Sequence, residues 1–212
     1  MIAAPLFKMY DGYYVVDFRM NVRKFSSAPI NGGYGPCERY LNRTVPRNFS
    51  ADPVMDGIGF LRSEGIDFNG TCMTITACDV GGHSSGNAEA DGHNIYSWVT
   101  AGSSNALSMG SNGEPGAGTV NIAVATDAPL SDSASFNLIQ SIVEAKSQLF
   151  NDLGIRDKSS GRIAPGTSTD TVSLFVMSSL GTLPYAGRLT GIGRSTADLV
   201  YDLVGRAITM CI

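Results

Sequence analysis

Residues 131–153 carry the strongest structural signal in the chain, an apolar repeat that fits one face of an α-helix. Ser131 or Asp132 can cap the start of this helix, and Gly154 can end it. The apolar positions recur three and four residues apart: Leu138, Ile142, Ala145, Leu149 and Leu153. An amphipathic helix of this length must bury its apolar face against another element. The chain is therefore expected to hold a sheet or further helices for this helix to cover.

Two more helices are predicted. A second long helix should run from about Gly193 to Thr209, with Ile192, Leu199, Leu203 and Ala207 facing inward. A short helix is expected from Val54 to Arg62.

The strands precede and separate these helices. Asp11-Gly12 lies between two apolar, aromatic runs, which predicts a hairpin over Leu6–Phe18. Four further strands are expected at Thr71–Cys78, Ile95–Ala101, Val120–Thr126 and Thr171–Met177. The polar stretch from Ser26 to Pro53 and the segments Gly81–Asn94 and Gly102–Gly118 are interpreted as loops, and loops of this length are usually functional or mobile.

This order of elements predicts an α+β (mixed α/β) fold, in which a largely antiparallel or mixed sheet is covered by two long helices. A chain of 212 residues fits one core. We therefore expect a single domain over residues 1–212, with the N-terminal hairpin at about 5–19.

Composition excludes several partners. The formal net charge is −4, charged residues make up only 16%, and no Lys/Arg cluster with interleaved aromatics is present, so no nucleic acid partner is expected. No run approaches the roughly 20 apolar residues of a membrane helix, and no basic leader precedes the first apolar residues. A soluble, cytoplasmic protein is expected. A homo-oligomer is left open.

Cysteine and histidine give no metal motif. Cys37, Cys72, Cys78 and Cys211 form no C-x-x-C pair and are interpreted as buried thiols. His83 and His93 lie ten residues apart in the Gly/Ser/Asn-rich segment. This spacing matches no metal site, so they are interpreted as loop surface residues, the alternatives being metal ligands with Asp91 or an imidazole reaching a ligand's metal.

Lys146 is the most informative polar residue. At about 100° per residue it projects beside Ile139, Ile142 and Phe150, inside the apolar sector of its helix. A lysine there must extend its charge to solvent, pair with a carboxylate or take part in chemistry. Three carboxylates at strand ends are candidate partners: Asp79, Asp127 and Asp170.

Whether these carboxylates share one edge of the sheet depends on strand direction. Asp79 and Asp127 follow strands, as does Asn105 at a few residues' distance, whereas Asp170 precedes one. Asp170 joins the others only if its strand is antiparallel to theirs, and the long helix before it favours a parallel crossover instead. Each aspartate has the alternative role of a turn or cap residue.

Other candidates are backbone and hydroxyl groups. The tripeptide Asn31-Gly32-Gly33 would let the main chain approach a ligand, or it forms a plain tight turn. Thr169 stands beside Asp170, so its hydroxyl is a candidate nucleophile activated by a carboxylate. The alternative is a turn at the start of a strand, where Thr, Ser and Asp are common. Arg43 and Arg47 are interpreted as ligand-positioning groups or structural ion-pair partners.

Several blocks of the sequence resemble one known family, in its order. The stretches Ser26–Gly33 and Asn42–Asn48 resemble the opening of the adenosylcobinamide amidohydrolase (CbiZ-type) family. Six later blocks resemble its continuation: Met73–Val80, Val99–Ala106, Gly118–Ile122, Asp127–Asp132, Glu144–Lys146 and Gly166–Asp170. Together the blocks cover roughly residues 25–205. Cys78, where alanine is expected, departs from the pattern, and the Gly81–Asn94 segment does not align.

The resemblance implies hydrolysis of the amide that joins the corrin side chain to aminopropanol, giving adenosylcobyric acid in cobalamin salvage. Amide hydrolysis requires an activated water or nucleophile, donors for the oxyanion and an acid for the leaving amine. The candidate catalytic residues are Asp79, Lys146, Asp170 and Thr169, and the candidate substrate-binding residues are Asn31, Gly32, Gly33, Arg43, Asn105, Asn121 and Asp127. No metal site or cofactor is expected, since the corrinoid substrate itself carries cobalt. A non-catalytic corrinoid-binding protein and a hydrolase of a different amide remain alternatives.

Overall fold

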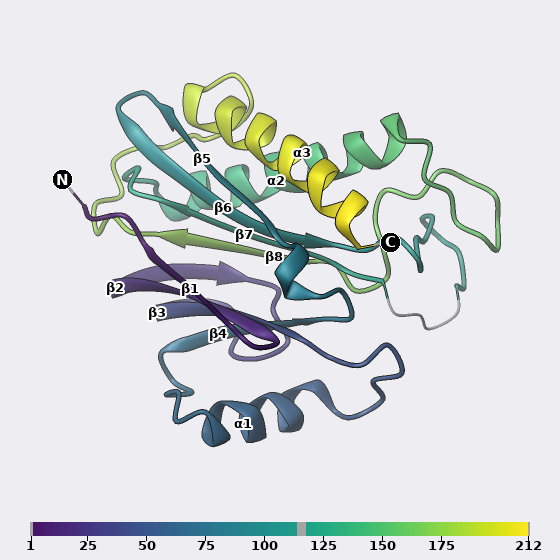
Figure 1. Ribbon diagram of the computed structural model, residues 1–212. Coiled ribbons are helices and arrows are strands. Elements are labelled where there is room, and N and C mark those ends of the chain that lie inside the picture. Colours follow the sequence, from purple (N-terminus) through teal and green to yellow (C-terminus); the bar gives the residue numbers. More distant parts are fainter. Residues whose placement is uncertain (1, 114–117, 212) are drawn as a thin grey trace.

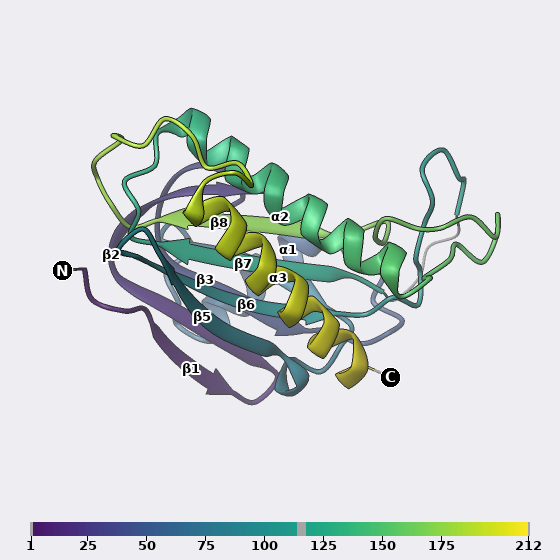
Figure 2. The same ribbon diagram turned by 90° about the horizontal axis from the view of Figure 1, so that it is seen from above.

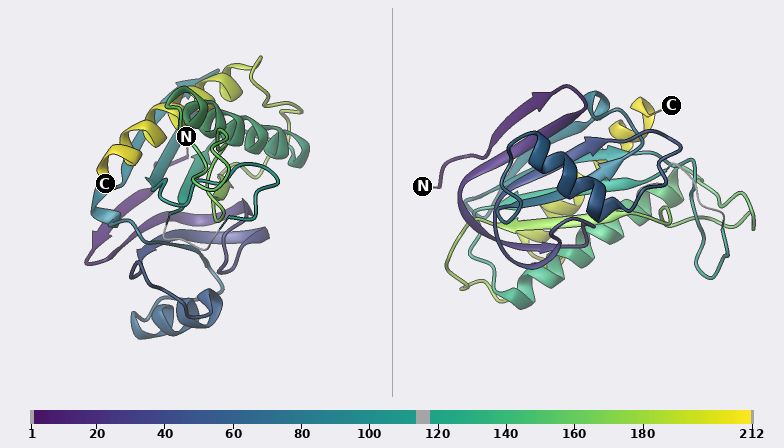
Figure 3. Two further views of the ribbon diagram at one scale, coloured as in Figure 1. Left: turned by 90° about the vertical axis from the view of Figure 1, so that its right-hand side faces the viewer. Right: turned by 90° about the horizontal axis from the view of Figure 1, so that it is seen from below.

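The computed structural model describes residues 2–113 and 118–211. In this part of the chain, eight strands form one mixed sheet in the order β4-β3-β2-β8-β7-β6-β5, with β1 paired to β2 beside this path. The sheet folds over so that β1–β4 and β5–β8 form two facing layers (Figure 1). Two long helices cover the β5–β8 layer and a shorter helix covers the other (Figures 1 and 3). The predicted α+β class with two covering helices is confirmed.

The helices begin and end close to where the sequence places them. They are α1 (Pro53–Ser63), α2 (Asp132–Asp152) and α3 (Gly191–Met210). The side chain of Ser131 caps α2 by accepting a hydrogen bond from the amide of Ala134. Seen from above, α2 and α3 lie side by side across the β5–β8 layer (Figure 2). None of these helices combines the length and apolar character that crossing a bilayer requires.

The strands are β1 (Leu6–Tyr10), β2 (Tyr13–Ser26), β3 (Gly33–Thr44), β4 (Thr71–Thr76), β5 (Ser84–Ala90), β6 (His93–Ala101), β7 (Val120–Thr126) and β8 (Thr171–Val176), with a short 3-10 helix, η1 (Val80–Gly82), between β4 and β5. The pairs β3–β4 and β7–β8 are parallel, and the other pairs are antiparallel. The N-terminal hairpin is confirmed, and its second strand extends beyond the expected end to Ser26.

Two strands were missed because their composition is atypical. Strand β3 contains Gly35 and Pro36, but β4 pairs with it only from Arg39 onward, so the proline removes no hydrogen bond from that ladder. Strand β5 lacks branched and aromatic residues, yet Asp91 and Gly92, both at positive φ, form the turn that joins it to β6. The interpretations of 26–53 and 81–94 as loops were therefore wrong over these strands.

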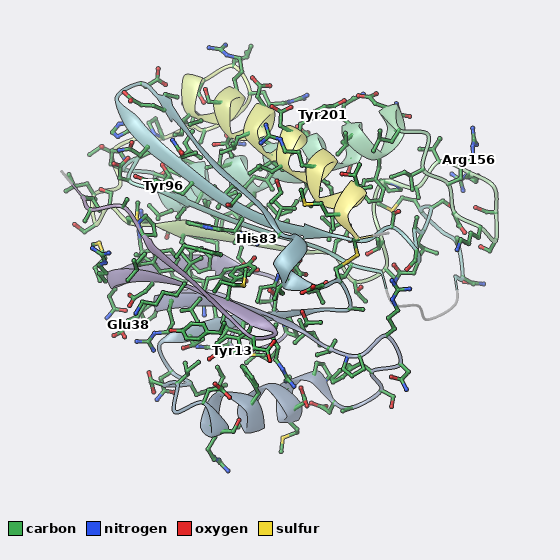
Figure 4. The ribbon with its side chains drawn as sticks, viewed as in Figure 1. Tyr13, Glu38, His83, Tyr96, Arg156 and Tyr201 are labelled. Atoms are coloured by element: carbon green, nitrogen blue, oxygen red, sulfur yellow. A yellow bond between two sulfur atoms is a disulfide. The ribbon has the colours of Figure 1, made fainter. Side chains whose placement is uncertain are left out.

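Three apolar clusters hold the four layers together. The largest lies between the β5–β8 layer and the helices α2 and α3. The second fills the space between the two sheet layers and includes Tyr14, Trp98 and Phe175. The third packs β2–β4 against α1 and includes Tyr13, whose hydroxyl donates to Glu64 Oε2 at 2.9 Å (Figure 4).

The expectation of four thiols was wrong for two cysteines. Cys78, just after β4, and Cys211, just after α3, form a disulfide. They are separated by 133 positions, and only the tertiary fold brings their Cα atoms to 5.5 Å. Cys37 and Cys72 are free and buried, and burial raises the pKa of the Cys72 thiol to about 11.

The interpretation of both histidines as loop surface residues was wrong for His93, which lies in a strand, and His83 lies in a short connection but is partly buried. His93 begins β6, and His83 follows η1, where its ring stacks on Phe7 of β1 and lies beside Tyr14 of β2 (Figure 4). Burial in this aromatic cluster lowers the pKa of His83 below its ordinary value of 6.5, and a hydrogen bond with the carbonyl of Val80 only partly opposes the shift.

Reduction of the disulfide should lower the free energy of unfolding by about 2 to 4 kcal/mol, because the long loop it closes regains its entropy in the unfolded state. Urea unfolding with and without reductant measures the effect. A Cys78→Ser variant is the control and should be insensitive to reductant. Equal midpoints for oxidised and reduced wild-type protein would contradict the expectation.

Stability should fall as pH drops below about 6.5, because His83 binds a proton more readily in the unfolded state, where its pKa is ordinary. The contribution is complete above that pH and is lost as pH falls toward the lowered pKa of the folded state. Urea midpoints at pH 7.5 and 5.5 test this, with His83→Gln as the comparison. The variant should lose less stability over this interval than the wild type, and an equal loss would rule the His83 contribution out.

Candidate active site

Polar side chains from distant segments meet at one end of the two layers. The end of β6 pairs with the start of β7, and the start of β7 pairs with the start of β8. The end of β4 in the other layer reaches the same place, where Asn121 Nδ2 donates to the carbonyl of Ile75 at 2.9 Å. In Figure 1 the segments after β6 and before β8 extend together from this end of the sheet.

A cavity of about 600 Å³ opens at this end, between the layers. Three groups of residues form most of its wall: Val45–Phe49 after β3, Ile75–Ala77 at the end of β4, and Gly118, Thr119 and Thr169–Thr171 at the starts of β7 and β8. Ser27, Pro29 and Pro53 complete the lining. The volume is in the range of small-molecule sites.

Lys146 and Asp170 form an ion pair at this wall. Lys146 of α2 is only 7% exposed, and its Nζ lies 2.5 Å from Asp170 Oδ2. Of the three alternatives left open for this lysine, the structure shows pairing with a carboxylate, and Asp170 is the partner among the three candidates. The two charges come from α2 and from the residue just before β8, and they meet because α2 leads from the end of β7 back to the start of the parallel strand β8.

Three more donors fix the Asp170 carboxylate. Its Oδ1 accepts hydrogen bonds from the amide of Val120 at 3.0 Å and from the hydroxyl of Thr167 at 2.5 Å. Its Oδ2 also accepts the amide of Thr167 at 3.1 Å. With Lys146 included, four donors surround the two oxygens, which holds the carboxylate in one orientation.

Gly166 lets the main chain pass over the ion pair. A Cβ at this position would lie 2.2 Å from Asp170 Oδ2 and 2.3 Å from Lys146 Nζ. No side chain fits there without displacing the two charges. The carbonyl of Gly166 accepts a hydrogen bond from the amide of Leu107, which ties the segment after β6 to the same turn.

Thr169 is exposed on the cavity wall. Its hydroxyl donates to the carbonyl of Gly118 at 3.0 Å, and its own carbonyl accepts from the hydroxyl of Thr119. Asn105 lies close by, where its Nδ2 donates to Ser168 Oγ at 3.0 Å, but it is not part of the cavity lining.

Asn121 does not reach the cavity. It is fully buried between the layers, where its Nδ2 donates to Asn42 Oδ1 and its Oδ1 accepts from the hydroxyl of Thr171 at 2.8 Å. Thr171 lines the cavity, so Asn121 orients a wall residue. Asn42 in turn bonds to Thr74 and Thr100, and the hydroxyl of Tyr14 accepts from it. Burial raises the pKa of Tyr14, which remains a neutral phenol.

Asp79 and Asp127 occupy structural positions. Asp79 lies at the same end of β4 as the cavity but is exposed and caps η1 by accepting the amide of Gly81 at 2.8 Å. Asp127 follows β7 at the opposite end from Asp170, because β7 and β8 are parallel, and accepts two hydrogen bonds from Asn94.

The remaining candidates also lie outside the cavity wall. The side chain of Asn31, at positive φ, donates to the carbonyls of residues 68, 69 and 71. Gly32 packs against the carbonyl of Ala28, and Gly33 starts β3 at positive φ. Arg43 pairs with Asp56 of α1 at 2.6 Å and lies over the ring of Phe60.

Sequence reasoning gave little weight to the turn after β3. Arg47 and Asn48 are exposed and line the cavity, whereas the neighbouring Arg43 is a structural ion-pair partner. The Asn42–Asn48 block contains both arginines, one on each side of Pro46. Their positions in the sequence do not show which of them faces the cavity. Within residues 2–113 and 118–211, no three His, Cys, Asp or Glu side chains are grouped as metal ligands.

Comparison with known protein families shows which family the chain belongs to. A family model described as adenosylcobinamide amidohydrolase (CbiZ) matches residues 5–211. The chain belongs to this family. The match spans every block on which the resemblance was based, and the family description indicates a hydrolase. A search of curated proteins found no match.

Among solved structures, the protein PH0078 from Pyrococcus horikoshii OT3 is similar, with a TM-score of 0.51 and 9% identity over 96% of this chain and 79% of that one. At this identity the likeness concerns the fold alone.

Replacing Lys146 by Met should lower the free energy of unfolding by roughly 3 to 5 kcal/mol, because it leaves the Asp170 carboxylate without its cation. The matched control is Glu144→Gln, also in α2, which breaks the exposed ion pair of Glu144 with Arg188. This variant should change the free energy of unfolding by less than about 1 kcal/mol. Urea unfolding of both variants measures the difference. Similar small losses for the two would show that the Lys146 pair does not stabilise the fold.

Proposed function

We propose that the protein hydrolyses the amide between the corrin side chain and aminopropanol of adenosylcobinamide, releasing aminopropanol and adenosylcobyric acid. One observation carries this proposal beyond family membership. The cavity contains a carboxylate, Asp170, that is held by a buried lysine and lies beside the hydroxyl-bearing wall residues Thr119, Thr169 and Thr171. This combination of a fixed carboxylate and a polar wall suits acid–base work on an amide.

Substrate size favours entry of the side chain alone. Adenosylcobinamide is far larger than the drug-sized ligands that sites of this volume enclose. The aminopropanol amide would enter the cavity while the corrin ring stays at its mouth. Pro46, Phe49 and Pro53 offer the ring apolar contacts, and Asn48 and Ser27 offer hydrogen bonds to its peripheral amides.

Asp170 is the proposed base and acid. Among the described residues that line the cavity, it is the one carboxylate, and no histidine accompanies it. Asp170 would take a proton from a water molecule as the water oxygen bonds to the amide carbon. It would then return that proton to the nitrogen as the carbon–nitrogen bond breaks. Water must replace one of the present donors to Asp170, and the Thr167 hydroxyl is the donor that can rotate away.

Lys146 and Thr169 would support this chemistry in different ways. Lys146 keeps the Asp170 carboxylate oriented toward the wall, and is therefore a positioning residue. Thr169 presents a hydroxyl that can orient the water or, in the alternative route, attack the amide itself and form an ester. For the direct route its proton would have to leave the carbonyl of Gly118, which is no base.

Incubation of the purified protein with adenosylcobinamide should release aminopropanol and adenosylcobyric acid in equal amounts. Asp170→Asn should lower kcat by about 100-fold or more, the usual contribution of an acid–base group. Asp198→Asn removes an exposed carboxylate on α3 and should retain wild-type turnover. Circular dichroism shows whether each variant is folded.

Thr169→Val and Thr169→Ser separate the two routes even if Asp170→Asn does not fold. With water as the attacking group, Thr169→Val retains part of the activity, whereas direct attack predicts complete loss in Thr169→Val and retention in Thr169→Ser. Tight binding of adenosylcobinamide without aminopropanol release would favour a corrinoid-binding protein. Faster hydrolysis of simple amides than of the corrinoid would indicate a different substrate.

A further inference from the structure

The cavity carries one cation without a partner in the described part of the chain. Among the lining residues that the structure describes, Arg47 and Asp170 are the two charged side chains. The charge of Asp170 is already matched by Lys146 at 2.5 Å. Arg47 makes no ion pair or hydrogen bond to any residue within 2–113 or 118–211, so its guanidinium gives the cavity an uncompensated positive charge.

The backbone holds Arg47 at the cavity wall. It occupies a turn in which the amide of Phe49 donates to the carbonyl of Pro46 at 2.9 Å. The base of this turn is attached to the end of β4, where the amide of Val45 donates to the carbonyl of Thr76 at 2.8 Å. Thr76 is itself part of the wall. Hydrogen bonds therefore attach the main chain of this turn to the cavity wall.

We propose that Arg47 is the anion-recognising residue of the cavity, which contacts the scissile carbonyl oxygen as it becomes negative and then the carboxylate of the product. This inference rests on the proposed hydrolysis and adds a residue to it. Amide hydrolysis turns a neutral acceptor into an oxyanion and finally into a carboxylate. A guanidinium binds both charged species more strongly than the neutral amide, and it matches a carboxylate with two parallel hydrogen bonds.

This assignment predicts an unequal effect on substrate and product. Arg47→Gln should lower kcat by about 10- to 100-fold with little change in KM, since the neutral amide gains least from the charge. The same variant should weaken inhibition by adenosylcobyric acid by about tenfold or more. Arg47→Lys should recover part of both effects, because it restores the charge without the two-pronged geometry.

The matched control is Arg62→Gln, which removes an exposed arginine in the last turn of α1 outside the cavity and should leave kcat, KM and inhibition unchanged. Direct binding of adenosylcobyric acid and adenosylcobinamide to wild type and to Arg47→Gln provides a readout that needs no turnover. The expected result is a selective loss of affinity for the acid.

The outcomes separate the two proposals. In one outcome, wild type hydrolyses adenosylcobinamide, but Arg47→Gln weakens the binding of acid and substrate equally or weakens neither. The role proposed for Arg47 is then wrong, and the proposed function stands. If wild type binds the acid through Arg47 but releases no aminopropanol, the proposed function fails and the anion site stands as a binding feature.

Discussion

Strand β2 is the element on which the four-layer arrangement depends. Its first residues pair with β1 and its last four residues pair with β8. Strand β3 pairs with both of these parts of β2. The register shifts between Asp17 and Val22, where Arg19 adopts positive φ and its amide bonds to the side chain of Asp17. A bulge of this kind bends a strand and increases its twist. The bend lets one continuous sheet turn over and enclose an apolar centre between its own halves.

Polar contacts then fix how the halves meet. Asn42 of β3 and Asn121 of β7 bond across the interface, and each makes further hydrogen bonds to its surroundings. A buried amide with all its groups paired tolerates few alternative positions, because any shift would leave a polar atom unsatisfied. The cavity is formed where this network ends, with Thr171 and Ile75 serving both the network and the wall.

Local signals in the sequence were sufficient for the helices and for Lys146, but not for what surrounds them. The apolar repeat of α2 placed Lys146 in a buried sector, which made a carboxylate partner one of three alternatives for its charge. Which aspartate it would meet depended on strand direction, and that depends on long-range pairing. The pairing of Cys78 with Cys211 had no local signal either. Asn31 and Arg43 lie in the same polar sequence blocks as residues of the cavity wall. Only the folded structure shows that Asn31 bonds to the 68–71 segment and that Arg43 pairs with α1.

The parallel pairing of β7 and β8 has a consequence for how the site is assembled. The ion pair joins residues 24 apart in the chain, whereas the Asn42–Asn121 contact joins residues 79 apart. The charged part of the site thus belongs to a single strand–helix–strand unit, and its loop-closure cost is lower than that of the interlayer contact by about 1 kcal/mol. The opposite wall of the cavity, which carries Arg47, comes from the N-terminal half of the chain. The cavity therefore needs both halves of the sheet, whereas the Lys146–Asp170 ion pair lies within one of them.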